Sequence, residues 1–133
     1  MVATGLVTTR SQVSVSETID RIVAGATRRG LIVFARIDHA DGAAKVGMRL
    51  RPTELVIFGH PRGGTPLMID RQTAGIDLPV KALAWEDAEG KVWLTYNDAH
   101  WLAQRHDLGP QSADAVDAIG AGLSLLAEEA TAP

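Results

Sequence analysis

The spacing of apolar residues predicts an amphipathic helix near the start of the chain. Apolar side chains recur there every three or four positions and would share one helix face: Val15, Ile19, Ile22, Val23 and Ala26. Ser14 and Glu17 have the spacing of a capping box, in which the two side chains satisfy free amides of the first turn. Gly30 suits a left-handed cap at the other end. We predict a helix from Ser14 to Arg29.

Apolar runs bounded by turn residues predict three strands in the first half of the chain. Gly5 to Thr9 is a short strand, and Glu54 to Phe58 is a longer one that runs into a glycine-rich segment. Leu31 to Ala35 is apolar at every position, which favours a central strand covered on at least one side by helices.

Strict alternation predicts a β-hairpin in the second half. Val80 to Trp85 and Lys91 to Tyr96 flank a polar turn that ends at Gly90, where a positive φ is expected. A hairpin requires antiparallel pairing, so the sheet cannot be wholly parallel.

Four further helices follow from caps, breakers and periodicity. The first covers Ala43 to Met48 with Asp41 as its cap, and the second opens at Thr65-Pro66 and closes at Gly75. The third covers Ala99 to His106 with Asn97 or Asp98 as its cap. The fourth is an amphipathic helix over about residues 111–130.

This order of elements predicts the α+β class in a single domain, residues 1–133. We expect one mixed or antiparallel sheet of about five strands, with helices packed mainly on one face. The helices after the second and third strands are too short for a doubly wound fold.

Composition narrows the protein class only slightly. The chain has 133 residues, 46% of them apolar, and no cysteine, which excludes disulfides and thiolate chemistry. A net charge of −3 argues against a nucleic-acid partner, which normally requires a basic face. Without a signal peptide or a long apolar run, we expect a cytoplasmic protein with no membrane partner.

The segment from His60 to Pro66 is the first candidate site. Arg62 supplies a permanent cation, and Gly63, Gly64 and Thr65 could present backbone amides at a helix start. Such a loop can hold a phosphate or a carboxylate, although its spacing matches no nucleotide motif. The alternative is a turn of fixed shape in which Thr65 caps the helix.

Two histidine positions are candidates for catalysis. Asp38-His39 and His60 each follow a predicted strand, so parallel neighbouring strands would bring them to one sheet edge. His39 beside Asp38 could then act as a general base or share a metal. Metal-ligand spacing is missing, so we predict no metal and no cofactor, and a turn role remains the simpler alternative. His100 and His106 are expected to be solvated.

Lys81 is the remaining polar candidate because it interrupts an apolar strand. A lysine there needs water or a carboxylate partner, for which Asp70 and Asp77 are available. A structural ion pair and a desolvated nucleophile are the two alternatives.

Several motifs resemble one known family. The runs LVIFGHPRGGTPLM, GIDLPVKALAWED and GKVWLTYND, preceded by Asp38-His39, Gly42-Ala43 and Leu50-Arg51-Pro52, are similar to the bacterial and archaeal family called domain of unknown function 302. The resemblance covers about residues 5–106. It implies a compact fold of the TATA-binding-protein-like type and homodimers, and it implies no activity. The family usually has asparagine where this chain has His60.

Three classes of function remain open. The first is a small dimeric module that binds an anionic small molecule or a protein partner, with ligand contacts from His60, Arg62, Gly63, Gly64, Thr65 and Lys81. The second is a hydrolase or isomerase that uses Asp38, His39 and Arg62. The third is a structural or scaffolding domain.

Overall fold

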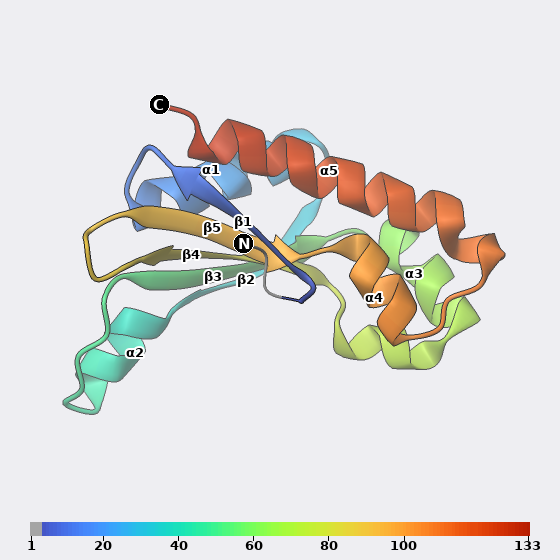
Figure 1. The fold of residues 1–133 in the computed structure, drawn as a ribbon, viewed down its shortest axis with the longest axis horizontal. Helices are drawn as coiled ribbons and strands as arrows, with labels where there is room; N and C mark the ends of the chain where they lie inside the picture. The colour runs from blue at the N-terminus through green and yellow to red at the C-terminus, as the bar shows by residue number, and fades with distance from the viewer. Residues whose placement is uncertain (1–3) are drawn as a thin grey trace.

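The computed structural model describes residues 4–133 and contains one five-stranded antiparallel sheet (Figure 1). The strands are β1 (Leu6–Ser11), β2 (Ile32–Asp38), β3 (Thr53–Gly59), β4 (Val80–Glu86) and β5 (Val92–Asn97). Their order across the sheet is β1-β5-β4-β3-β2, and every neighbouring pair is antiparallel. The predicted α+β class is confirmed, and the sheet is antiparallel throughout.

The helices divide into a covering layer and a group at one end of the sheet. They are α1 (Val15–Arg28), α2 (His39–Lys45), α3 (Pro61–Asp70), α4 (Ala99–Arg105) and α5 (Ala113–Thr131), with 3₁₀ turns η1 (Gln72–Ile76) and η2 (Pro110–Ser112). In Figure 1, α1 and α5 lie on the same face of the sheet, α3 and α4 gather beyond one end, and α2 lies at the other end. The prediction of helices mainly on one face is confirmed.

The core lies between the sheet and the α1–α5 layer. Ile19 and Ile22 of α1, Phe58 of β3 and Leu94 of β5 are all almost fully buried there. The α1 helix begins as predicted, since the Ser14 hydroxyl accepts a hydrogen bond from the Glu17 amide at 3.1 Å. The amphipathic pattern therefore identified the helix and its buried face correctly.

A glycine allows α1 and α5 to pack closely. A Cβ atom built on Gly25 would lie 2.8 Å from Cδ2 of Leu126, closer than side chains normally approach. The absence of a side chain at this position thus brings the two helices together above the sheet.

The β2 strand lies at the edge of the sheet, so its predicted central position is wrong. Ile32 and Phe34 are 43% and 52% exposed, and a bulge shifts the register between Val33 and Ala35. An all-apolar strand is typical of a buried position. Here Val33 packs against the core on the helix-covered face, while Ile32 and Phe34 are exposed at the edge of the sheet.

The helix after β2 begins four residues earlier than predicted. The Asp38 carboxylate, and not Asp41, is the cap, and it accepts a hydrogen bond from the Asp41 amide at 2.9 Å. Both aspartates have suitable capping chemistry, and the strand end decides between them because Asp38 is the last residue of β2 and directly precedes the helix.

His106 is buried, in contrast to the predicted solvated position. Its side chain is only 7% exposed, and Nε2 lies 2.5 Å from the Asp77 carboxylate. Nδ1 lies 3.1 Å from the Thr73 hydroxyl. Because η1 folds against the end of α4, two segments 29 residues apart enclose this imidazole.

Candidate functional site

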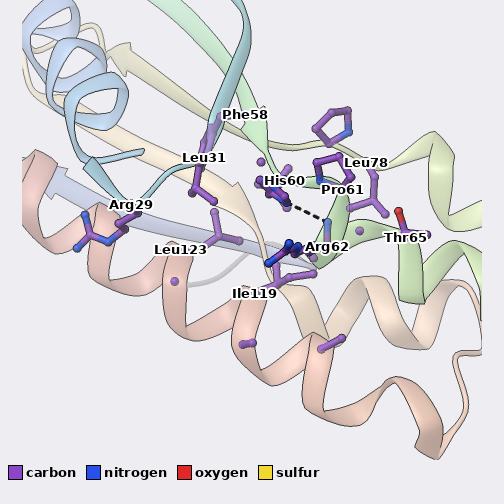
Figure 2. Close-up of a pocket in the computed structure, with 18 of the residues that line it drawn as sticks. Arg29, Leu31, Phe58, His60, Pro61, Arg62, Thr65, Leu78, Ile119 and Leu123 are labelled. Atoms are coloured by element: carbon purple, nitrogen blue, oxygen red, sulfur yellow. Dashed lines mark hydrogen bonds between the residues drawn. The ribbon is translucent and has the colours of Figure 1, made fainter. Parts of the chain in front are cut away.

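A cleft of about 770 Å³ lies where β2 begins, β3 ends, and α3 and α5 converge. Figure 2 shows its two walls. One wall is α5, which contributes Ile119 and Leu123, and the other carries Leu31 and Leu78. Phe58 lies at its inner side and is also a core residue. The cleft therefore has an apolar interior continuous with the protein core.

Small residues on α5 create the space. Ala115, Ala118 and Gly122 line the cleft and are three and four residues apart, so they share one helix face. A Cβ atom built on Gly122 would meet no other atom within 4 Å. The wall is hollow at this point because the helix carries no side chain there.

The α3 helix begins at the mouth of the cleft, four residues earlier than predicted. His60 is its cap, and Nδ1 of the imidazole accepts a hydrogen bond from the Arg62 amide at 3.1 Å (Figure 2). Pro61 takes the first helical position, which proline favours. The predicted turn role of Thr65 as cap is therefore wrong. His60 does here what the asparagine usual in the family would also do, because both side chains offer an acceptor.

The predicted amide cradle is not formed at Gly63 and Gly64. Both residues lie in the first turn of α3, and their amides donate to the His60 carbonyl at 2.9 and 3.3 Å. Sequence alone suggested a glycine loop before a helix, but the glycines are helical. They still line the cleft together with Thr65. Any strong hydrogen bond to an anion must therefore come from side chains and not from these backbone amides.

Arg62 is the cation without a partner in the cleft. Its side chain is exposed, and within residues 4–133 its guanidinium makes no hydrogen bond or salt bridge. Figure 2 shows it directed from α3 toward α5. Its donors are therefore free to bind a ligand at the mouth of the cleft.

Arg29, a second arginine in the lining, is already neutralised. Its guanidinium forms a two-point salt bridge with Glu129 and also donates to the Gly25 carbonyl at 3.1 Å. The hydrogen bonds between the two side chains raise the pKa of Arg29 and lower the pKa of Glu129 from their ordinary values. The two arginines thus differ in what they can offer a ligand.

Asp38 and His39 lie at the opposite end of the sheet from Arg62. The register pairs Asp38 with Glu54, while β3 reaches Arg62 only after Gly59. At about 3.3 Å per strand residue, five residues of β3 already separate the two places by more than about 16 Å. The condition for a shared site was parallel neighbouring strands, and β2 and β3 are antiparallel. The structure does not bring the predicted catalytic group together.

Lys81 is also outside the cleft. It pairs with Ile57 across β3 and β4, on the sheet face away from α1 and α5. Its ammonium donates to the carbonyls of Pro79 at 2.8 Å and Asp77 at 3.2 Å. Partial burial lowers the pKa of Lys81, and the nearby Asp77 charge opposes this shift. The predicted carboxylate pairing is wrong, since the Asp77 carboxylate bonds Arg105 and His106 instead.

No group of three or more His, Cys, Asp or Glu side chains within residues 4–133 is placed to hold a metal ion. Within the same residues, no helix combines the length and apolarity needed to cross a membrane. The contribution of α5 was missed at the sequence level. A run of small residues at helical spacing, Ala115, Ala118 and Gly122, was the available signal.

The open antiparallel sheet, with one helical layer and a cleft at its end, defines a small α+β domain. Its sequence matches the family described as Domain of unknown function DUF302 over residues 7–125. The chain belongs to this family, as its motifs predicted. A solved structure described as an uncharacterized conserved protein DUF302 from Bacillus stearothermophilus has the same fold, with a TM-score of 0.84 at 16% identity. The alignment covers 96% of this chain and 99% of that one.

Curated relatives carry a different name. "Fluoride-specific ion channel FluC 1" of Brucella suis biovar 1 (strain 1330) is 55% identical over 122 residues, which are 92% of this chain and 48% of the relative. "Fluoride-specific ion channel FluC 2" of Brucella melitensis biotype 1 (strain ATCC 23456 / CCUG 17765 / NCTC 10094 / 16M) is also 55% identical over 122 residues, 92% of this chain and 45% of that protein. The chain spans about half the length of the curated relatives it matches.

Proposed function

We propose that this protein is a binding module for a small anionic molecule held in the cleft. The unpaired guanidinium of Arg62 at the mouth of an apolar space of about 770 Å³ carries the proposal. Small-molecule sites commonly have volumes of about 300–1,000 Å³, mostly apolar linings and a few polar groups that fix orientation. The cleft has each of these properties.

The chemistry of the lining supports binding over catalysis. Only four of the lining residues have polar side chains: Arg29, His60, Arg62 and Thr65. Arg29 is paired with Glu129, and Nδ1 of His60 is occupied by the Arg62 amide. Among residues 4–133, no carboxylate lines the cleft. A hydrolase or isomerase needs a base or nucleophile beside its substrate, and this lining offers only the outer nitrogen of His60 and the Thr65 hydroxyl.

The test is anion-dependent stabilisation. A ligand that binds only the folded state stabilises it by about 2.7 kcal/mol at a hundredfold excess over its Kd. We expect phosphate or acetate to raise the melting temperature of the wild type and to raise that of Arg62→Ala much less. Arg49→Ala is the matched control, because Arg49 is exposed and outside the cleft but carries the same charge. Equal anion-induced shifts in all three proteins would leave only nonspecific salt effects.

We also propose that the protein is a homodimer. Apolar side chains are exposed along the edge strand β2: Ile32, Phe34 and Ile37. Exposed apolar patches and apolar edge strands are typical of surfaces that meet a second chain. Light scattering at tens of micromolar should give twice 14.1 kDa, and a monomer at that concentration would contradict the proposal.

The relatives support a third, wider proposal about domain organisation. We propose that a channel activity in those longer proteins belongs to the half that this chain does not match. The supporting observation is that no helix within residues 4–133 is suited to cross a membrane. In a fluoride-sensitive bacterial strain, the unmatched half of the Brucella suis protein should restore fluoride tolerance, and this chain alone should not. Tolerance restored by this chain alone would overturn the proposal.

A further inference from the structure

We infer that the ligand is a single-chain amphiphile: a monoanionic head group on Arg62 with an unbranched apolar chain along α5. This inference rests on the proposed function of the cleft and names the ligand class. It follows from the walls of the cleft, from its charge and from its length.

The walls favour an apolar body. Leu31 and Leu78 face Ile119 and Leu123 across the space. The polar side chains that line it, within the described part of the chain, are Arg29, His60, Arg62 and Thr65. A sugar or nucleotide would have to desolvate its hydroxyl groups against walls that offer them few partners, which is costly. A hydrocarbon chain loses nothing there and gains from each methylene removed from water.

The charge favours a single negative group. Arg62 is the one lining cation without a partner among the described residues, whereas Arg29 is bonded at two points by Glu129. One free guanidinium can bind one carboxylate or one sulfate ester in its forked geometry, and each of these groups carries a single negative charge. A diphosphate or a dicarboxylate would leave a second charge beside apolar side chains.

The length of the α5 wall limits the chain. The lining residues on this helix run from Ala115 to Leu126, which at about 1.5 Å per residue is about 17 Å. Gly122 leaves the path open near its far end, because nothing lies within 4 Å of a Cβ atom at that position. An extended chain advances about 1.3 Å per carbon–carbon bond because it zigzags, so roughly ten to twelve carbons span about 11–14 Å and leave room for the head group within this length.

The experiment is a titration calorimetry series with acetate, hexanoate, octanoate, decanoate and dodecanoate below their micelle concentrations. It uses the full chain as wild type, Arg62→Ala and Arg49→Ala. We expect the wild-type Kd to fall about two- to fourfold with each added methylene up to decanoate, and to fall less steeply from decanoate to dodecanoate. Arg62→Ala should weaken every acid by about ten- to a hundredfold and keep the same dependence on length. Arg49→Ala should behave as the wild type.

The outcomes separate the inference from the proposed function. Arg62-dependent binding that is as tight for acetate as for decanoate would overturn the amphiphile and leave an anion-binding module. Absence of Arg62-dependent binding for every acid and for inorganic phosphate would overturn both. Equal weakening by Arg49→Ala would assign the effect to net charge and overturn the inference.

A parallel arm distinguishes a free amphiphile from a lipid head group. The protein is sedimented with vesicles of phosphatidylglycerol, with and without decanoate. We expect little sedimentation without decanoate and no increase with it. Vesicle binding that depends on Arg62 and that decanoate does not displace would place the site on a membrane surface and overturn the inference.

Discussion

Replacing Gly122 with leucine should stabilise the protein and at the same time close its cleft. Glycine inside a helix is usually a cost to stability, because its backbone is freer in the unfolded chain. Gly122 lies inside α5, its added side chain would meet open space, and that space is the cleft. The substitution therefore tests whether the space serves binding or only results from loose packing.

The size of the effect follows from two contributions. Exchanging glycine for leucine inside a helix contributes about 0.7 kcal/mol. Burying a leucine side chain fully contributes about 1.5–3 kcal/mol, and roughly half of that applies in a cleft that is open on one side. The free energy of unfolding should rise by about 1.5–2 kcal/mol, which raises the melting temperature of a domain this size by about 5–8 °C.

The assay combines chemical unfolding with decanoate titration. Gly122→Ala separates the two contributions, since it adds helix propensity of about 1 kcal/mol but fills little of the cleft. Gly42→Leu is the matched control, because Gly42 lies inside α2, meets nothing within 4 Å and is outside the cleft. The free energy of unfolding of Gly42→Leu should rise only by the contribution from helix propensity, and its affinity for decanoate should be unchanged.

Two results would refute this reasoning. If Gly122→Leu destabilises the protein, the space beside α5 is not available as described. If it stabilises the protein and decanoate binds with unchanged affinity, the ligand does not occupy the part of the cleft that Gly122 opens.

Substitutions at three further positions test the contacts that hold the helices in place. Gly25→Ala should lower the free energy of unfolding by about 1 kcal/mol in urea melts, since crowding against Leu126 outweighs the gain in helix propensity; a stabilised variant would contradict the close contact. His60→Ala should lower the free energy of unfolding by about 1 kcal/mol because it removes the α3 cap, whereas His60→Asn should keep the cap and the stability. Equal losses of stability in both variants would show that the cap is unimportant. Asp70 accepts hydrogen bonds from the Ser112 hydroxyl at 2.7 Å and the Gly109 amide at 2.8 Å, which lower its pKa. The stability that the Asp70 carboxylate contributes is therefore present above the pKa of an aspartate in the unfolded chain, near 3.9, and is lost as the pH falls through the lower pKa of the folded protein. Asp70→Asn should be less stable than the wild type at neutral pH but lose less stability on acidification. Parallel curves of unfolding free energy against pH for the two proteins would contradict this.

Local patterns were sufficient for the elements that carry strong periodicity. The α1 helix and the β4–β5 hairpin were predicted because a 3.6-residue or two-residue repeat coincides with clear caps and turns. The position of β2 could not be predicted, since an apolar strand has the same pattern at a covered position and at an exposed edge. Strand order is decided by contacts between distant segments, which no local window contains.

The candidate site was predicted only on one side. The segment around Arg62 was recognised from its unusual residues, and it does line the cleft. Its glycines were interpreted as a loop because glycine normally interrupts helices, whereas Pro61 and the His60 cap start the helix before them. The opposite wall lies about fifty to sixty residues later in α5, and only folding brings the two walls together.

The exposed edge of the sheet and the cleft share one side chain. Phe34 of β2 is 52% exposed and also lines the cleft. A second chain that pairs with the β2 edge would therefore rest against a wall of the binding space. Any resulting change in ligand affinity must be matched by an equal change in the affinity between the chains, because coupling between two binding events is reciprocal. Dilution series with and without decanoate would then measure the coupling free energy between chain pairing and ligand binding. The ligand concentration would thereby control the fraction of chains that are paired.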